Sequence, residues 1–127
     1  MQNLIAIGAG GAIGALLRYG IATATHSFIP LENGFPLGTF IANMLGAFLM
    51  GILYQTFNQS AAHNELLRLL LTTGMLGALT TFSTFALEGV NLYRVGNSSM
   101  AVTYIVLSNL FGLLILFAGI TLVSRLS

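Results

Sequence analysis

The chain has 127 residues, of which 56% are hydrophobic and only 6% charged, and its formal net charge at pH 7 is +1. A soluble domain carries roughly 25% charged residues, so this composition excludes an ordinary water-exposed surface and favours a membrane protein. Lysine, basic clusters and cysteine are all missing from the sequence, which excludes electrostatic nucleic-acid binding, disulfides and thiolate metal sites.

Four hydrophobic segments are long enough to cross a bilayer as helices, each of which takes roughly 20 residues. They cover about residues 4–24, 37–57, 66–93 and 100–123. Residues typical of turns separate them, around 30–36, 58–65 and 94–99. The first segment is longer than the apolar core of a secretory signal, so we expect it to remain as a helix. The sequence therefore predicts an all-α membrane protein with a single four-helix domain over residues 1–127.

The arginines are divided almost evenly between the two predicted sides of the membrane. Arg68 and Arg125 fall on one side, and Arg94 falls on the other, together with Arg18 if it lies near the end of the first helix. The positive-inside rule then has little bias to act on, so insertion in both orientations is a hypothesis that this pattern permits. Two oppositely inserted copies would pair about a two-fold axis in the membrane plane.

Small residues form helix faces that suit close backbone contact. Gly10 and Gly14 are four apart in the first segment, and Gly38, Ala42 and Gly46 follow the same spacing in the second. These faces serve packing either within the chain or between chains, and the sequence leaves both open. Since four short helices enclose little room for a central path, we expect an oligomer.

The third segment combines glycines with hydroxyl residues between Gly74 and Phe85. A bilayer has no water to satisfy loose backbone groups, so such a stretch must be buried in protein or line a wet path. The segment is also longer than one span requires. We therefore predict a helix broken near residues 74–81, in a protein that moves something small and polar.

Phe82 and Phe85 are three apart and are expected to project from one helix face. Such a pair usually belongs to the core or faces lipid, but the hydroxyls around it favour another interpretation. The edge of an aromatic ring carries partial positive charge. Rings presented edge-on would accept a small anion without offering it a full positive charge.

Isolated polar residues lie within the second and fourth segments. Asn43 is either a clamp between helices or a donor to a permeating anion, because an unbonded amide is costly in a membrane. For Asn109 we favour the clamp. Tyr104 and Ser108 are four apart and present two hydroxyls on one face, although serine in a membrane helix often bonds its own backbone.

The charged residues inside the spans also have two interpretations each. Arg18 either neutralises an anion at a pore mouth or snorkels to the headgroups. Glu88 is the only acid well inside a span, and it belongs either to a functional site or to a water-filled vestibule. His26 and His63 fall in predicted loops without ligand-spaced partners, so we expect them to be solvated. With no catalytic triad, carboxylate pair or phosphate loop, the sequence predicts no enzyme.

These patterns together resemble the Fluc/CrcB family of fluoride channels. The run from Gly77 to Phe85 looks like the family signature, and residues 10–19 and 38–46 agree with it. The resemblance implies a passive fluoride-selective channel of the cell inner membrane that lowers cytoplasmic fluoride. It further implies a dual-topology antiparallel homodimer with two parallel pores.

The resemblance also implies roles for individual residues. The implied pore residues are Phe82 and Phe85 as ring-edge ligands, with Asn43, Ser83, Thr84, Tyr104 and Ser108 as polar groups along the path. Arg18 matches a basic residue near the vestibule, and Glu88 falls at a vestibule position. Gly77 and Thr80 match a helix break whose backbone carbonyls, from both subunits, hold a central structural sodium ion. The chain departs from some members at Gly112, one turn after Ser108, where no hydroxyl is present.

Two other functions remain open. A proton-coupled small multidrug exporter also has four short helices and dual topology, but it needs a membrane carboxylate, best placed in the first span. Only Glu88 could serve, and it lies in the third. A non-transporting scaffold subunit is the other alternative, and it leaves the hydroxyl–phenylalanine run unexplained.

Overall fold

The computed structural model describes residues 1–29, 34–59 and 64–126, so His63 and most of the first two predicted loops lie outside the described residues. Three of the four spans are single helices: α1 (Gln2–Phe28), α2 (Leu37–Gln59) and α6 (Ser98–Leu126). With the third span, residues 65–94, these are four helices long and apolar enough to cross a membrane. The described residues contain no strand. The prediction of an all-helical chain with four spans is confirmed.

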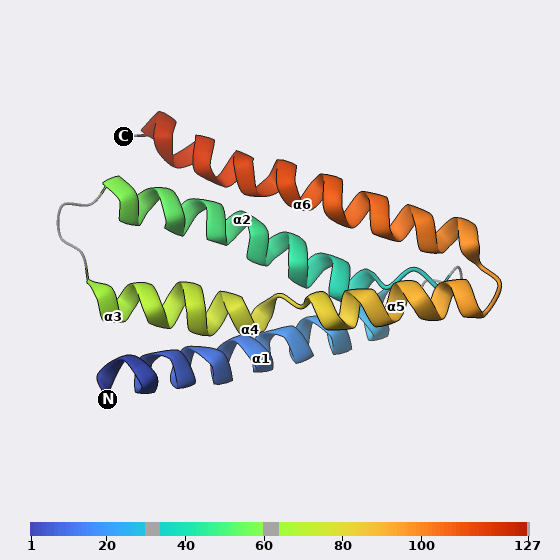
Figure 1. Ribbon diagram of the computed structural model, residues 1–127, viewed down its shortest axis with the longest axis horizontal. Coiled ribbons are helices and arrows are strands. Elements are labelled where there is room, and N and C mark those ends of the chain that lie inside the picture. Colours follow the sequence, from blue (N-terminus) through green and yellow to red (C-terminus); the bar gives the residue numbers. More distant parts are fainter. Residues whose placement is uncertain (30–33, 60–63, 127) are drawn as a thin grey trace.

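The third span is assembled from four consecutive elements. These are α3 (Glu65–Arg68), the π-helix η1 (Leu69–Leu76), α4 (Gly77–Leu79) and α5 (Phe82–Arg94). Between α4 and α5, Thr80 and Thr81 have extended backbone, with ψ of 152° and 121°. The two parts nevertheless continue in nearly the same direction, so the span is only slightly bent at this point (Figure 1).

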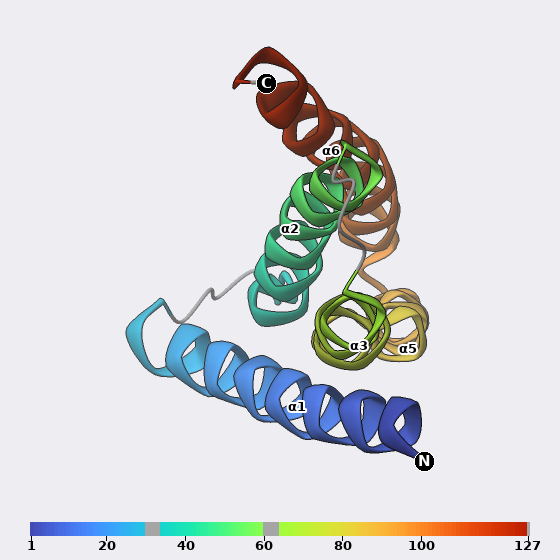
Figure 2. The same ribbon diagram turned by 90° about the vertical axis from the view of Figure 1, so that its left-hand side faces the viewer.

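The third span lies between two layers of helix. In the view along the long axis, α1 crosses on one side of it, while α2 and α6 lie together on the other (Figure 2). The closest packing is that of α6 along α2 and of α1 along η1 and α4. Both termini share one end of the bundle, as an even number of antiparallel spans requires (Figure 1).

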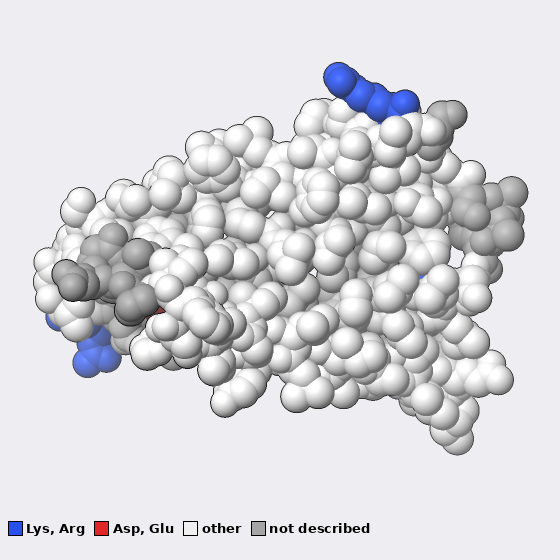
Figure 3. Space-filling model, turned by 180° about the vertical axis from the view of Figure 1, so that it is seen from behind, with Lys and Arg blue, Asp and Glu red and all other residues white. Residues whose placement is uncertain are grey.

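The buried core is small for a chain of this length. One cluster consists of Ala42, Leu76 and Leu79, and a second is built around Phe85 and Tyr104. Large apolar side chains elsewhere are exposed, and on the face seen from behind the conspicuous basic side chains lie at the margins (Figure 3). Such an uncharged surface matches hydrocarbon or another apolar protein face, because water would make its exposure costly.

The small-residue faces are used within the chain. A Cβ on Gly10 would overlap the Leu70 carbonyl oxygen, and one on Gly14 would overlap that of Met75. In the same way, Gly46 faces the Thr80 side chain. The glycines therefore let α1 approach η1, and α2 approach the interruption after α4, at backbone distance.

We expect Gly14→Ala to destabilise the protein by about 1–3 kcal/mol, because the new methyl meets backbone that cannot move aside alone. The temperature at which the solubilised protein loses its size-exclusion peak should fall by several degrees. Gly8→Ala is the matched control, since its Cβ would have nothing within 4 Å. Equal stability of the two variants would contradict the close contact between α1 and η1.

Candidate functional site

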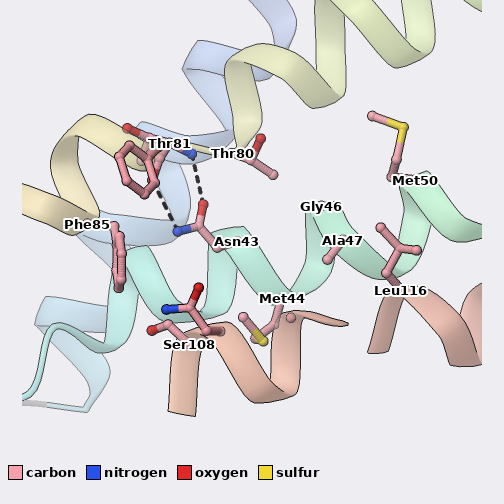
Figure 4. A pocket seen from close by; sticks show the side chains of 13 residues that line it. Asn43, Met44, Gly46, Ala47, Met50, Thr80, Thr81, Phe85, Ser108 and Leu116 are labelled. Atoms are coloured by element: carbon pink, nitrogen blue, oxygen red, sulfur yellow. Dashed lines mark hydrogen bonds between the residues drawn. The ribbon is translucent and has the colours of Figure 1, made fainter. Parts of the chain in front are cut away.

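Asn43 of α2 is bonded to the interruption in the third span. The Thr81 N–H donates to Asn43 Oδ1 at 2.8 Å, and Asn43 Nδ2 donates to the Thr81 carbonyl at 3.2 Å. Figure 4 shows both bonds. One side chain thus satisfies both backbone groups of an extended residue, which a membrane would otherwise leave without a partner. Because an amide carries two N–H donors, one amide hydrogen of Asn43 is not used by these bonds.

The same region releases backbone carbonyls, among them those of Gly77 and Thr80. In a continuous helix the Gly77 carbonyl would accept from Thr81 N–H and the Thr80 carbonyl from Thr84 N–H. Here the Thr81 N–H donates to Asn43, and the Thr84 N–H donates to Thr81 Oγ1 at 3.2 Å, which caps α5. Gly77 is itself exposed on the surface of the chain. Two carbonyls three residues apart therefore lose their ordinary helical partners.

A cavity of about 360 Å³ opens beside this interruption. Its lining includes Asn43, Phe82, Phe85 and Ser108 (Figure 4). The two phenylalanine rings are neighbours, with centroids 5.7 Å apart and planes tilted by 47°. Phe85 is only 9% exposed whereas Phe82 is 79% exposed. The cavity is thus walled by one buried ring and one ring that a single chain leaves uncovered.

Ser108 brings an unpaired hydroxyl to this cavity. Its Oγ is buried and has no hydrogen-bond partner among the described residues. A buried hydroxyl without a partner is costly in an apolar setting, so such a group marks a place for a polar ligand or water.

Glu88 occupies a separate polar centre in the same half of the bundle. Its Oε1 accepts a hydrogen bond from Thr39 Oγ1 and its Oε2 accepts one from the Tyr104 hydroxyl, both at 2.7 Å. Thr39 belongs to α2 and Tyr104 to α6, so the carboxylate joins three spans. Tyr104 is fully buried.

Two further cavities of about 290 and 300 Å³ meet at Glu88 and Thr39. Arg18 lines the first of them, and its Nε is buried without a hydrogen-bond partner in the described part of the chain. His26, which is exposed at the end of α1, lines the second. The structure thus brings the two predicted vestibule residues, Arg18 and Glu88, to one cavity.

Seven other polar side chains in the spans satisfy themselves locally. They bond the carbonyl four residues earlier in their own helix, as is usual for hydroxyls in apolar helices. The side chains that do so are Thr25, Thr56, Thr72, Thr80, Asn109, Thr121 and Ser124. Thr39, Asn43 and Tyr104 instead reach across to another span. Thr80 and Asn109 line the candidate cavity although they bond their own helix, so the bonds between spans mark Thr39, Asn43 and Tyr104 but do not by themselves outline the site.

Several predicted residues lie differently from the expectation. Within the described chain, Asn109 is exposed and donates to the Ile105 carbonyl, so it does not clamp two helices. Tyr104 and Ser108 do share a face of α6, but only Ser108 lines the cavity beside Phe82. Ser83 and Thr84 both lie within hydrogen-bond distance of Thr81 Oγ1, at 3.3 and 3.0 Å.

Thr39 is a site residue to which the sequence analysis gave no role. It lies four residues before Asn43, so both side chains fall on one face of α2. That spacing was a usable signal. The role of Thr81 as the residue held by Asn43 had no such signal, because it depends on contact between two spans.

We expect Asn43→Leu to leave the N–H and the carbonyl of Thr81 unpaired and to destabilise the fold by about 1–3 kcal/mol for each of the two groups. Asn43→Asp keeps the acceptor for the Thr81 N–H but sets a carboxylate oxygen against the Thr81 carbonyl, so it should also be less stable than the wild type. Thermal unfolding and hydrogen exchange at the Thr81 amide measure both effects. As a matched control, Asn109→Leu removes an amide that bonds only its own helix. If the Thr81 amide of Asn43→Leu exchanged its hydrogen as slowly as in the wild type, the two bonds between Asn43 and Thr81 would be contradicted.

Comparison with known proteins gives a consistent assignment. The family model described as CrcB-like protein, Camphor Resistance (CrcB), matches residues 5–120. A relative from Ruminiclostridium cellulolyticum, named fluoride-specific ion channel FluC, is 47% identical over 111 residues, covering 87% of this chain and 84% of the relative. A FluC from Dehalococcoides mccartyi is 42% identical over 126 residues, covering 99% and 95%.

A third relative, fluoride-specific ion channel FluC 1 from Staphylococcus aureus, is 45% identical over 118 residues and covers 93% of both chains. The matches extend through all four spans and include the interruption after α4. With four long apolar helices, they identify a multi-pass membrane protein. The chain belongs to the CrcB-like family.

Proposed function

We propose that this protein is a passive fluoride-selective channel of the cell inner membrane that lowers cytoplasmic fluoride. The relatives with which it shares 42–47% identity bear the name of a fluoride-specific ion channel. The structural observation that carries the proposal is the cavity at the Asn43-held interruption, where two phenylalanine rings and an unpaired Ser108 hydroxyl meet. The proposal includes no enzymatic step.

The lining chemistry suits a small, strongly hydrated anion. Hydroxyl and amide N–H groups donate hydrogen bonds, and aromatic ring edges carry partial positive charge, so together they replace hydration water group by group. In this proposal Ser108 Oγ, the unused Asn43 amide hydrogen and the edges of Phe82 and Phe85 contact the ion, with Ser83 and Thr84 further along the path. The rigid rings limit the bore and so reject larger anions.

Arg18 and Glu88 form the vestibule of the proposed path. Arg18 attracts the anion into the cavity that both side chains line. The Glu88 carboxylate would repel it, but Thr39 and Tyr104 each donate a hydrogen bond to that carboxylate and spread its charge. In this proposal Tyr104 acts on the path by bonding Glu88, and its hydroxyl does not itself donate a hydrogen bond to the ion.

A second copy of the chain completes the pore in this proposal. The exposed Phe82 and the open cavity beside it are surfaces that a partner would cover. The near-even arginine distribution supports a partner inserted the other way up, because the positive-inside rule then favours neither orientation. An antiparallel homodimer of this kind has two equivalent pores.

A sodium ion at the centre of that dimer is the proposed cofactor. Carbonyl oxygens are ligands for hard cations, and the Gly77 and Thr80 carbonyls have lost their usual helical partners. These groups therefore fit such an ion, and a two-fold axis would double their number. The ion would hold the two interruptions together without any carboxylate ligand.

We expect liposomes containing the protein to release fluoride rapidly and chloride hardly at all, at a rate that does not change when the proton gradient is collapsed. Ion-selective electrodes measure both anions side by side. Loss of flux on collapsing the gradient would instead indicate a proton-coupled exporter. Release of neither fluoride nor chloride would indicate a scaffold.

Phe82→Ile and Phe85→Ile should each lower fluoride flux at least tenfold, because isoleucine fills much of the space but has no ring edge. The same liposome assay measures the loss, and size exclusion checks that the dimer persists. Phe117→Ile is the matched control, since Phe117 is exposed on α6 and lines none of the three cavities. Wild-type flux in either pore variant would remove the ring-edge mechanism.

We expect sodium to raise the thermal stability of the dimer relative to potassium or choline at equal ionic strength. A ligand present at a hundred times its dissociation constant stabilises the bound form by about 2.7 kcal/mol. Thermal unfolding in the three salts measures this, and identical midpoints in all of them would count against the sodium site.

A further inference from the structure

The aromatic contacts continue beyond the proposed pore rings. Phe85 lies against Tyr104, with centroids 5.2 Å apart, and Tyr104 lies against Phe35, with centroids 5.4 Å apart. The planes of Phe35 and Tyr104 meet at 84°, an edge-to-face geometry. Phe35 is therefore the next ring after Tyr104 in a continuous series that begins at Phe82.

Phe35 also borders the outer cavity. It lines the space of about 300 Å³ that reaches Glu88 and Thr39. Tyr104 lines none of the three cavities and is fully buried. Phe35 thus contacts Tyr104 on one side and the cavity on the other.

The backbone holds Phe35 in place although it precedes the helix. Gly34 has a φ of +77°, a value that favours glycine, and the Leu37 N–H donates to the Phe35 carbonyl at 2.8 Å. Pro36 restricts both its own φ and the conformation of the residue before it. The backbone of Phe35 is thus restrained, and its ring can leave Tyr104 only by rotation about the side-chain torsions.

We propose that Phe35 is a positioning residue of the channel, which keeps the Tyr104 hydroxyl on Glu88 by packing edge-to-face against the Tyr104 ring. Among the residues that the structure describes, Tyr104 bonds Glu88 Oε2 and packs against the rings of Phe35 and Phe85. Without Phe35, the Tyr104 ring gains room toward the cavity and its hydroxyl spends less time on the carboxylate. The inference rests on the proposed function, because it assigns Phe35 to that same path.

Phe40 provides a matched control within the same cluster. Its ring packs against Phe35, with centroids 5.5 Å apart, and both residues lie on the cluster formed around Phe85 and Tyr104. No ring contact joins Phe40 to Tyr104 in the described part of the chain. Phe40→Leu therefore loses a comparable ring from the cluster without removing the contact to Tyr104.

The first measurement is fluoride efflux from liposomes. Phe35→Leu should lower flux about 2- to 10-fold, the factor that one edge-to-face contact supports. Phe35→Tyr retains a ring and should stay within about twofold of wild type on the same basis. Phe40→Leu should also retain its flux. An equal loss in Phe40→Leu and Phe35→Leu would overturn the proposal, because general loosening of the cluster would then explain both.

The second measurement reports on Tyr104 itself and needs no transported fluoride. The chain has four tyrosines, so labelling with 3-fluorotyrosine gives four ¹⁹F resonances in fluoride-free buffer, and Tyr104→Phe identifies one of them. Loss of the Phe35 ring current displaces that resonance even if Tyr104 does not move, so the informative change is splitting or broadening, which reports more than one position of the ring. The Tyr104 resonance should split or broaden in Phe35→Leu and stay a single sharp peak in Phe40→Leu. A single sharp Tyr104 resonance in Phe35→Leu overturns the proposal whatever the flux, and so does a split resonance with wild-type flux.

The two measurements separate this inference from the proposed function. If the wild-type protein releases no fluoride, the proposed function fails, together with any role of Phe35 in conduction. The positioning of Tyr104 by Phe35 is then judged by the resonance alone, with the same result overturning it.

Discussion

The structure depends on the two hydrogen bonds between Asn43 and the backbone of Thr81. Extended backbone inside a membrane has no water to bond, and each unsatisfied group costs several kcal/mol. A single amide on a neighbouring span supplies both the acceptor and the donor that Thr81 needs. This makes two non-helical residues tolerable in the third span while its overall direction hardly changes (Figure 1).

The site is built on this interruption. Because the Thr81 N–H is bonded to Asn43, the Gly77 carbonyl is released, and because Thr81 Oγ1 caps α5, the Thr80 carbonyl is released as well. The new helix begins at Phe82, which lies on the open surface, while Phe85, one turn later, lies in the core against Tyr104. The released carbonyls and the placement of the two phenylalanine rings are therefore two results of one local arrangement.

The polar groups of the spans fall into two kinds, and the difference has a physical basis. A hydroxyl that bonds its own helix costs little in lipid, so its presence in a span does not indicate a ligand or a partner helix. Thr39 and Tyr104 forgo that bond and meet on Glu88, while Ser108 Oγ and Arg18 Nε are buried and have no hydrogen-bond partner in the parts of the chain that the structure describes. Buried polar groups without a partner stabilise a polar ligand most when they border a cavity. The proposed path therefore follows Ser108 and Arg18.

The sequence by itself determined the four spans, because backbone in lipid must form helices wherever a long apolar run occurs. It also indicated that residues 74–85 differ from an ordinary span, since glycines and hydroxyls are unusual at membrane depth, but the break predicted there is only a slight bend (Figure 1). The roles of Phe82, Phe85 and Asn43 in conduction stay predictions. Only the tertiary structure decided what each polar group bonds. Asn43 contacts Thr81, and Glu88 joins Thr39 and Tyr104, in each case across separate spans. Phe35, which precedes α2, packs on Tyr104 of α6. The spacing of residues along one helix cannot predict these contacts, because they depend on how closely the glycine faces allow neighbouring helices to approach each other.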